Sequence, residues 1–272
     1  MGKIMKKVFL ICTMCLMALT MRAANDGPKV EYVDLGVSVK WATCNLGASK
    51  PEDYGDYYAW GETEPYYDGQ ATLTWKDDKP EGYRWSSYAW CNDGDYTCLT
   101  KYNTDSKFGI VDNKTVLEEA DDVARVKGGG RLPTDAEWTE LRTQCTWTKI
   151  TRGGVTGYSV TSKVNGNSIF LPAAGYRSGR SLNGDDVGGH YWSSSVDTEF
   201  PYTAWRVYFN SGGVYRCNLS RVVGLPVRPV SESGPNSPSD SLVIPSEAKE
   251  SVSALPTLLF FVDLQRLHVN NT

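Results

Sequence analysis

The chain has 272 residues, of which 40% are hydrophobic and 22% are charged, and its formal net charge is −4 at pH 7. This length is enough to bury one hydrophobic core, or at most two. The negative charge argues against a nucleic-acid-binding protein, because such proteins usually present a basic face to phosphate groups. The 9 Trp, 16 Tyr and 26 Gly residues favour short strands joined by long loops over a helical bundle.

Residues 1–24 are typical of a secretion signal. Lys3, Lys6 and Lys7 precede an apolar run from Val8 to Met21, and this run is too short for a comfortable membrane span. We therefore expect a cleaved signal and an exported protein without a transmembrane span, located in the periplasm, at the cell surface or outside the cell. An uncleaved anchor helix is the alternative.

Residues 25–230 are predicted to form one domain. Its first element is a hairpin over Tyr32–Ala42, where two β-rich runs flank Gly36. Residues 62–84 show no clear period and are predicted to be a long insertion. Short apolar or alternating runs predict further strands, at 157–162, 168–172, 191–195, 204–209, 214–217 and 224–230.

Two helices are predicted from capping boxes. In the first, Thr134 and Glu137 have the S/T-x-x-E spacing, and Trp138, Leu141 and Cys145 then follow on one helix face. The second prediction covers Thr115–Val126, where Thr115 and Glu118 repeat the same spacing.

Residues 231–272 are predicted to be a flexible tail. Ser, Pro and Glu dominate positions 231–256, a composition that cannot bury a core. The apolar run at 258–264 is too short to span a membrane.

Five cysteines follow the signal: Cys44, Cys91, Cys98, Cys145 and Cys217. An exported chain could pair four of them. Cys91 and Cys98 flank a turn-prone segment, so one hypothesis is a local disulfide. The other is that the cysteines are small buried hydrophobic residues. The chain has no CxxC and only two histidines, so we do not expect a zinc site.

Seven short phrases occur in order along residues 31–230: Tyr32–Gly36, Val39–Asn45, Tyr57–Glu62, Arg131–Trp138, Leu171–Arg177, Tyr191–Ser195 and Val227–Val230. As a set they resemble the Fibrobacter succinogenes major paralogous domain, a family common in exported proteins of Bacteroides-like bacteria. The phrase Arg131–Trp138 is also similar to the formylglycine-generating enzyme superfamily. The resemblance implies an α+β domain of C-type-lectin-like fold, with two short helices, a small, twisted, mainly antiparallel sheet and long loops.

The resemblance does not carry the enzyme's activity to this chain. That activity needs two cysteines near the C-terminal end, and only Cys217 lies in that region; one thiol cannot form a two-thiolate copper site. We therefore expect a binding module with no catalytic residues. A divergent enzyme of the formylglycine-generating type and a purely structural envelope protein remain the alternatives.

A ligand surface is expected near the C-terminal end of the domain. The resemblance extends to variable proteins diversified by retroelements, which carry their ligand surface in that region. Alternation along the strand predicts that Trp205, Val207 and Phe209 face the core. The predicted ligand-binding residues, for a protein or glycan partner, are Tyr202, Arg206, Tyr208, Tyr215, Arg216, Asn218 and Arg221.

No cofactor is expected, and calcium is the one alternative. Carboxylates are hard oxygen ligands of the kind calcium takes, and they cluster at 93–95, 103–107, 121–122 and 183–186. None of these segments matches the calcium-binding loop pattern. The five tryptophans at 41, 60, 138, 192 and 205 are predicted to pack in the core rather than to stack on sugars.

Overall fold

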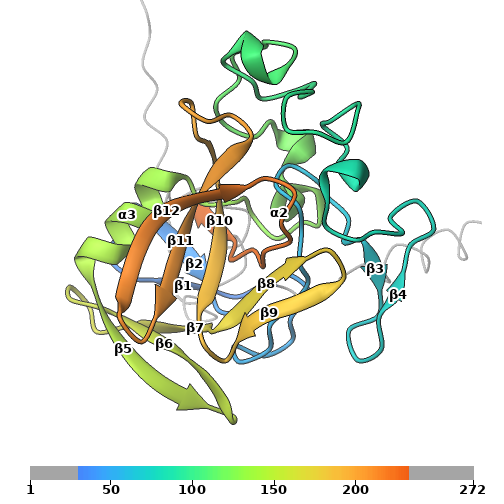
Figure 1. Ribbon diagram of the computed structural model, residues 1–272. Helices are drawn as coiled ribbons and strands as arrows, with labels where there is room; N and C mark the ends of the chain where they lie inside the picture. The colour runs from blue at the N-terminus through green and yellow to red at the C-terminus, as the bar shows by residue number, and fades with distance from the viewer. Residues whose placement is uncertain (1–29, 233–272) are drawn as a thin grey trace, which may run out of the picture. The chain divides into compact units, whose positions relative to one another are not determined.

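The predicted hairpin around Gly36 is present in the computed structural model, which describes residues 30–232 (Figure 1). Strand β1 (Tyr32–Asp34) pairs antiparallel with β2 (Val39–Ala42), and β2 also pairs with β13 (Val230–Glu232). Gly36 has a φ of +66° in the connecting turn, a conformation that glycine adopts without a steric penalty. Because β13 continues two residues past position 230, those two residues belong to the sheet and not to the predicted tail.

The largest sheet has five strands in the order β12-β11-β10-β8-β9 (Figure 1). Its pairs are antiparallel except for β8 with β10, which run parallel. The strands are β8 (Ala174–Ser178), β9 (Ser181–Asp185), β10 (Gly189–Val196), β11 (Thr203–Asn210) and β12 (Gly213–Ser220).

Two smaller antiparallel sheets complete the strands. Strands β5 (Cys145–Arg152), β6 (Val155–Ser162) and β7 (Ser168–Pro172) form one of them. The segment 62–84, predicted as an insertion, contains the two-residue pair β3 (Tyr67–Asp68) and β4 (Thr74–Trp75).

The helix predicted after Thr134 is confirmed as α3 (Asp135–Gln144). The Thr134 hydroxyl accepts the backbone N–H of Glu137, and the Glu137 carboxylate accepts the backbone N–H of Thr134 at 2.7 Å. Trp138 and Leu141 are buried on the inner face of the helix.

The helix predicted over Thr115–Val126 is mostly wrong. Only α2 (Val123–Val126) is α-helical, after a short 3₁₀ turn at Glu119–Asp121. Val116 instead forms an antiparallel bridge with Ser195 of β10, so pairing with the sheet overrides the local helix signal. Further 3₁₀ turns lie at Trp85–Ser87 and Ser106–Phe108.

Buried side chains cover both faces of the five-stranded sheet. One core lies between the sheet and α3 and includes Trp41, Trp138, Tyr191, Val207 and Phe209. A second core contacts the opposite face and includes Trp60, Tyr102, Trp192, Ala204 and Val227. Trp41, Trp60, Trp138 and Trp192 are each at most 3% exposed, which confirms the core role predicted for four of the five tryptophans.

Within residues 30–232, the observed fold class is α+β, with mostly strands, two short α-helices and mainly antiparallel sheets. None of the helices among residues 30–232 has the length and apolar character needed to cross a bilayer. The predicted signal at 1–24 and positions 233–272 of the predicted tail lie outside the described residues.

The local disulfide between Cys91 and Cys98 is not formed, and all five cysteines discussed above are free thiols. Cys91 is the bridge partner of Leu99, and neighbouring residues of an extended chain point to opposite sides. Cys98 is therefore directed away from Cys91. The Cys91 thiol instead donates to the Asp95 carbonyl at 3.0 Å.

Candidate functional site

The C-terminal hairpin has the pairing that its sequence predicts. Strands β11 and β12 pair over their whole length, from Thr203 opposite Ser220 to Asn210 opposite Gly213. Val207 and Phe209 are 2% and 1% exposed and pack in the core beneath α3. This alternation places Arg206 and Tyr208 on the opposite face of the sheet.

Trp205 does not pack fully in the core as predicted, and Arg216 does not share a face with Arg206 and Tyr208. Trp205 is on the α3 face but is only partly buried, and the Arg216 guanidinium lies 3.4 Å from its ring centroid. The Nε of Arg216 also lies 2.8 Å from both carboxylate oxygens of Asp135. Since Arg216 follows Tyr215 directly, the two side chains point to opposite faces and do not share one patch.

Tyr202 and Asn218 also lie apart from Arg206 and Tyr208. Tyr202 packs among the rings of Tyr96, Phe108 and Phe200, with centroid distances of 5.0–6.1 Å. The Asn218 amide donates to the Asp197 carboxylate at 2.5 Å, and Asp197 also accepts backbone N–H groups of the turn before β11. The contact of Asn218 therefore stabilises the turn.

Arg221 was predicted on the surface, but it is 0% exposed. Its Nε donates to the Tyr88 hydroxyl at 2.9 Å. Its two Nη atoms donate to the backbone carbonyls of Lys101, Tyr102 and Pro201 at 3.0–3.2 Å. Arg221 thus ties two loops to the end of β12 and is not accessible to a ligand.

The structure brings together Arg206, Tyr208 and Tyr215 from the predicted set and adds two residues that the sequence did not single out for binding. Four rings follow one another across four strands, and we call them the aromatic row: Tyr215 on β12, Tyr208 on β11, His190 on β10 and Tyr176 on β8. Successive ring centroids are 5.9, 4.6 and 5.1 Å apart. Tyr215 and Tyr208 are direct cross-strand partners, as are Tyr208 and His190.

From His190 to Tyr215, exposure increases along the aromatic row towards the sheet edge. His190 is 8% exposed and Tyr215 is 44% exposed, with Tyr208 partly buried between them. Tyr176 packs against the second core at the other end. Asn210 Nδ2 donates to the Tyr208 hydroxyl at 2.5 Å, which orients that hydroxyl at the margin of the sheet.

The charge at the aromatic row comes from Arg206. Its guanidinium contacts the Nδ1 atom of His190, and its Cζ lies 5.2 Å from the Tyr208 ring centroid. Burial and the adjacent Arg206 charge lower the pKa of His190 to about 3. His190 is therefore neutral at physiological pH, and Nδ1 accepts from the guanidinium. Burial also lowers the pKa of Arg206.

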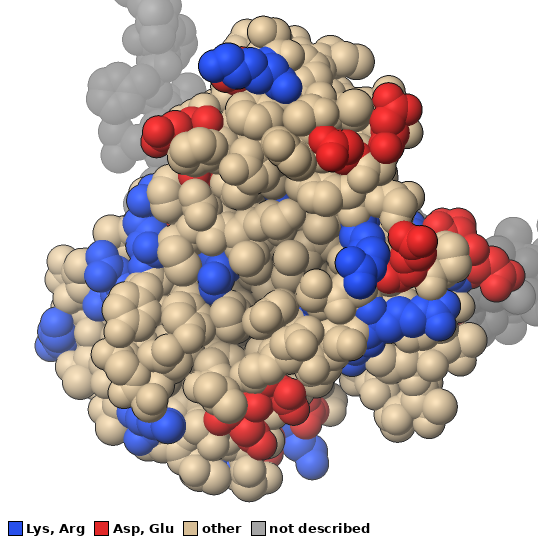
Figure 2. Space-filling view, in the orientation of Figure 1, with Lys and Arg blue, Asp and Glu red and all other residues tan. Residues whose placement is uncertain are grey.

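The surface around these strands is poor in other charges. Figure 2 shows that Lys, Arg, Asp and Glu side chains gather towards the edges of this view, whereas the surface over β10 and β11 is mainly uncharged. A ligand on the aromatic row therefore meets aromatic and neutral polar groups around one cation.

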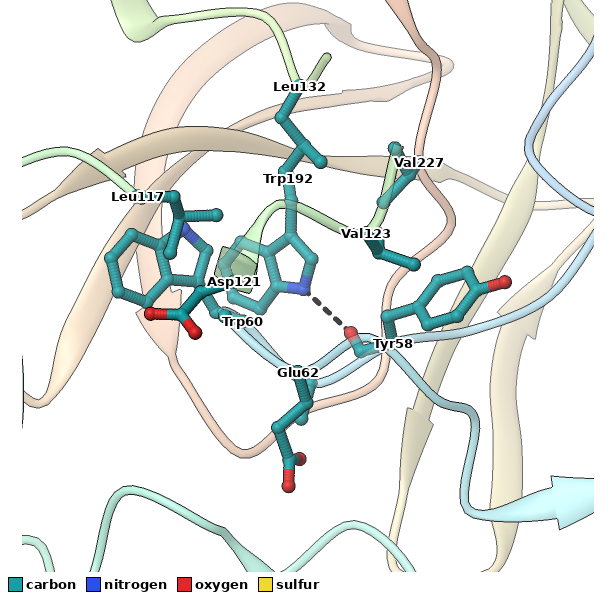
Figure 3. A pocket seen from close by; sticks show the side chains of 11 residues that line it. Tyr58, Trp60, Glu62, Leu117, Asp121, Val123, Leu132, Trp192 and Val227 are labelled. Atoms are coloured by element: carbon teal, nitrogen blue, oxygen red, sulfur yellow. Dashed lines mark hydrogen bonds between the residues drawn. The ribbon is translucent and has the colours of Figure 1, made fainter. Parts of the chain in front are cut away.

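A small cavity lies elsewhere, in the second core, with Trp60 and Trp192 in its wall (Figure 3). It is smaller than most ligand pockets. Its two carboxylates already have partners: Glu62 accepts from the Tyr66 hydroxyl and Lys79, and Asp121 accepts from Lys101 and the Tyr102 hydroxyl. The Trp192 indole N–H donates to the Tyr58 carbonyl at 2.9 Å, so the cavity wall is occupied by packing contacts.

The acidic segments considered for calcium are also used by the protein itself. Asp95 accepts from the backbone N–H and hydroxyl of Thr97, Asp105 caps a 3₁₀ turn, and Asp122 caps α2. Across positions 30–232, no group of three or more His, Cys, Asp or Glu side chains could hold a metal ion. The structure therefore gives no support to a calcium site there.

Comparison with known proteins gives one partial match. A model described as a domain of unknown function, DUF8237, matches residues 156–230. This segment contains every member of the aromatic row together with Arg206. No curated protein and no solved structure matches the chain.

Proposed function

We propose that this chain is an exported, non-catalytic binding module of C-type-lectin-like fold, related to the Fibrobacter succinogenes major paralogous domain. The proposed ligand surface is the aromatic row with Arg206. The resemblance of seven sequence phrases supports the family, and the α+β architecture with small antiparallel sheets is compatible with the fold.

The observation that carries the proposal is the arrangement of Tyr215, Tyr208 and Arg206 on one sheet face. Tyr and Arg are frequent in binding sites, because they offer large contact area and several donors at a modest ordering cost. Tyr215 is the most exposed member at 44%. The strands and their side-chain contacts hold the neighbouring groups in place, so little conformational entropy is lost on binding.

The Cys217 thiol, near the aromatic row, is poorly suited to the copper chemistry of the formylglycine-generating enzyme superfamily, which favours a binding function over a catalytic one. Cys217 is opposite Arg206 across the β11–β12 pair, and burial raises the pKa of its thiol. A thiol of raised pKa is mostly protonated at neutral pH, and a protonated thiol is a poor nucleophile and a poor metal ligand.

Matched tyrosine variants test the proposal. Tyr215 and Tyr96 have nearly equal exposure, 44% and 43%, but Tyr96 packs against Tyr202 instead of the aromatic row. The full chain would be screened on arrays of neutral and acidic glycans and of peptides. We expect Tyr215→Ala to lose the signals of the wild-type protein and Tyr96→Ala to retain them. Loss in Tyr96→Ala alone would move the ligand surface to the cluster around Tyr202.

A further inference from the structure

Three of the arginines in the C-terminal half, the buried Arg221 and Arg228 and the partly buried Arg206, differ in how their donors are satisfied. Arg221 makes five hydrogen bonds to neutral oxygens. Arg228 makes four, to the Asn45 side chain and to three backbone carbonyls at 2.7–2.9 Å. Among the described residues, the one hydrogen-bond partner of the Arg206 guanidinium is His190 Nδ1, and its Nε, like those of Arg142 and Arg177, is buried without a partner.

No carboxylate within the described part of the chain balances the charge of Arg206. Its electrostatic neighbours are Cys217, Tyr208 and Tyr176, and none of them is a carboxylate. An arginine carries five N–H donors in a rigid fork that fits a carboxylate. A partly buried guanidinium with unused donors and no counter-charge is unfavourable alone and gains most from a bound anion.

The groups next to Arg206 are aromatic rings and a hydroxyl, which can contact a sugar. The rings of Tyr208 and Tyr215 stack with an interplanar angle of 27°, and Tyr215 offers its exposed surface at the sheet edge. Aromatic faces are electron-rich and attract polarised C–H groups, which sugar rings present. The Tyr208 hydroxyl, which accepts from Asn210, retains a proton that it can donate to a ligand oxygen.

We propose, building on the ligand surface described above, that the aromatic row binds an acidic glycan, with a uronate carboxylate paired to Arg206 and a sugar ring stacked on Tyr215. A protein partner is less favoured, because protein interfaces usually centre on a cluster of apolar anchors. The more apolar exposed cluster lies away from the aromatic row, around Tyr96 and Phe200.

The test is calorimetric titration of the full chain with oligogalacturonate and with its methyl ester, which keeps the sugar and removes the charge. We expect the acid to bind at least about tenfold more tightly than the ester, as one charge-assisted contact implies. Arg206→Gln should remove this preference, and Tyr215→Ala should weaken both ligands. In the wild-type protein, added NaCl should weaken the acid but not the ester, which tests the ion pair without any variant.

The outcomes separate this inference from the proposed function. Equal binding of acid and ester, lost in Tyr215→Ala, would overturn the carboxylate pairing and leave the ligand surface in place. Binding of an oligoglutamate peptide through Arg206, without binding of either sugar, would overturn the glycan class. No binding of the acid, while array ligands still depend on Tyr215, would overturn the inference alone.

Discussion

Replacement of Arg221 by methionine tests the finding that this residue holds the fold together and does not bind ligand. Methionine retains much of the length of the side chain and is flexible enough to fill the space. It cannot donate, however, to the carbonyls of Lys101, Tyr102 and Pro201, which Arg221 satisfies in the interior.

Three acceptors would lose their donor, namely the buried carbonyls of Tyr102 and Pro201 and the partly buried carbonyl of Lys101. Each unsatisfied group costs about 1 kcal/mol at the low end of the measured range, so the variant should lose about 3 kcal/mol of unfolding free energy. Removing the desolvated charge offsets part of this loss. Replacing both partners of a buried ion pair by apolar residues can leave the unfolding free energy unchanged. Replacing Arg221 alone, however, leaves its carbonyl acceptors without a donor. For a domain of this size, the loss corresponds to a decrease in Tm of about 6–12 °C.

Urea denaturation followed by tryptophan fluorescence measures this change, because Trp60 lies beside the guanidinium, with its ring centroid 4.9 Å from Cζ. Arg180→Met is the matched control: Arg180 is exposed, so its replacement should change stability by less than about 0.5 kcal/mol. If Arg221→Met unfolded at the same urea concentration as the wild-type protein, the structural role assigned to Arg221 would be refuted.

Three further predictions concern a buried histidine, a helix cap and the thiols. Burial and the neighbouring guanidinium lower the pKa of His190 to about 3. Below pH 6.5 the unfolded chain therefore takes up a proton that the folded protein does not. The unfolding free energy, measured by urea titration, should fall by about 2 kcal/mol from pH 7 to pH 5. Thr134→Ala removes half of the capping box of α3 and should lower the unfolding free energy by about 1 kcal/mol, whereas Thr143→Ala, in the exposed last turn, should not. Cys145 is 3% exposed, and burial raises the pKa of its thiol. Maleimide should therefore label Cys98 in the native protein and leave Cys145 unlabelled, which mass spectrometry would measure.

Each of these predictions has a contradicting result. His190→Gln should flatten the profile between pH 7 and 5; an unchanged slope in His190→Gln would mean that another group titrates. Equal losses for the two threonine variants would contradict the cap. Prompt labelling of Cys145 would contradict its burial in the native state.

Local chemistry predicted the elements that depend on neighbouring residues. The spacing of Thr134 and Glu137 is enough to start α3, because both partners lie within one helical turn. The hairpin of β11 and β12 follows from alternation on either side of the turn at 211–212. Alternation also placed Val207 and Phe209 in the core.

The failures come from contacts between residues distant in sequence. Val116 has a helical pattern, but it bridges to Ser195, 79 positions later. The charge of Arg221 predicts exposure, and only the position of the loop carbonyls around it makes burial favourable. His190 joins the aromatic row through the antiparallel pairing of β10 with β11, and Tyr176 joins it through the parallel pairing of β8 with β10; no strand specifies either register alone.

The most direct test of the ligand surface is photo-crosslinking from within it. The photoreactive residue p-benzoylphenylalanine would replace Tyr215 in one preparation of the full chain and Tyr96 in another, each irradiated with a ligand identified on the arrays. We predict crosslinked product from position 215 and none from position 96. Crosslinking from position 96 with none from position 215 would contradict the assignment of the aromatic row as the ligand surface.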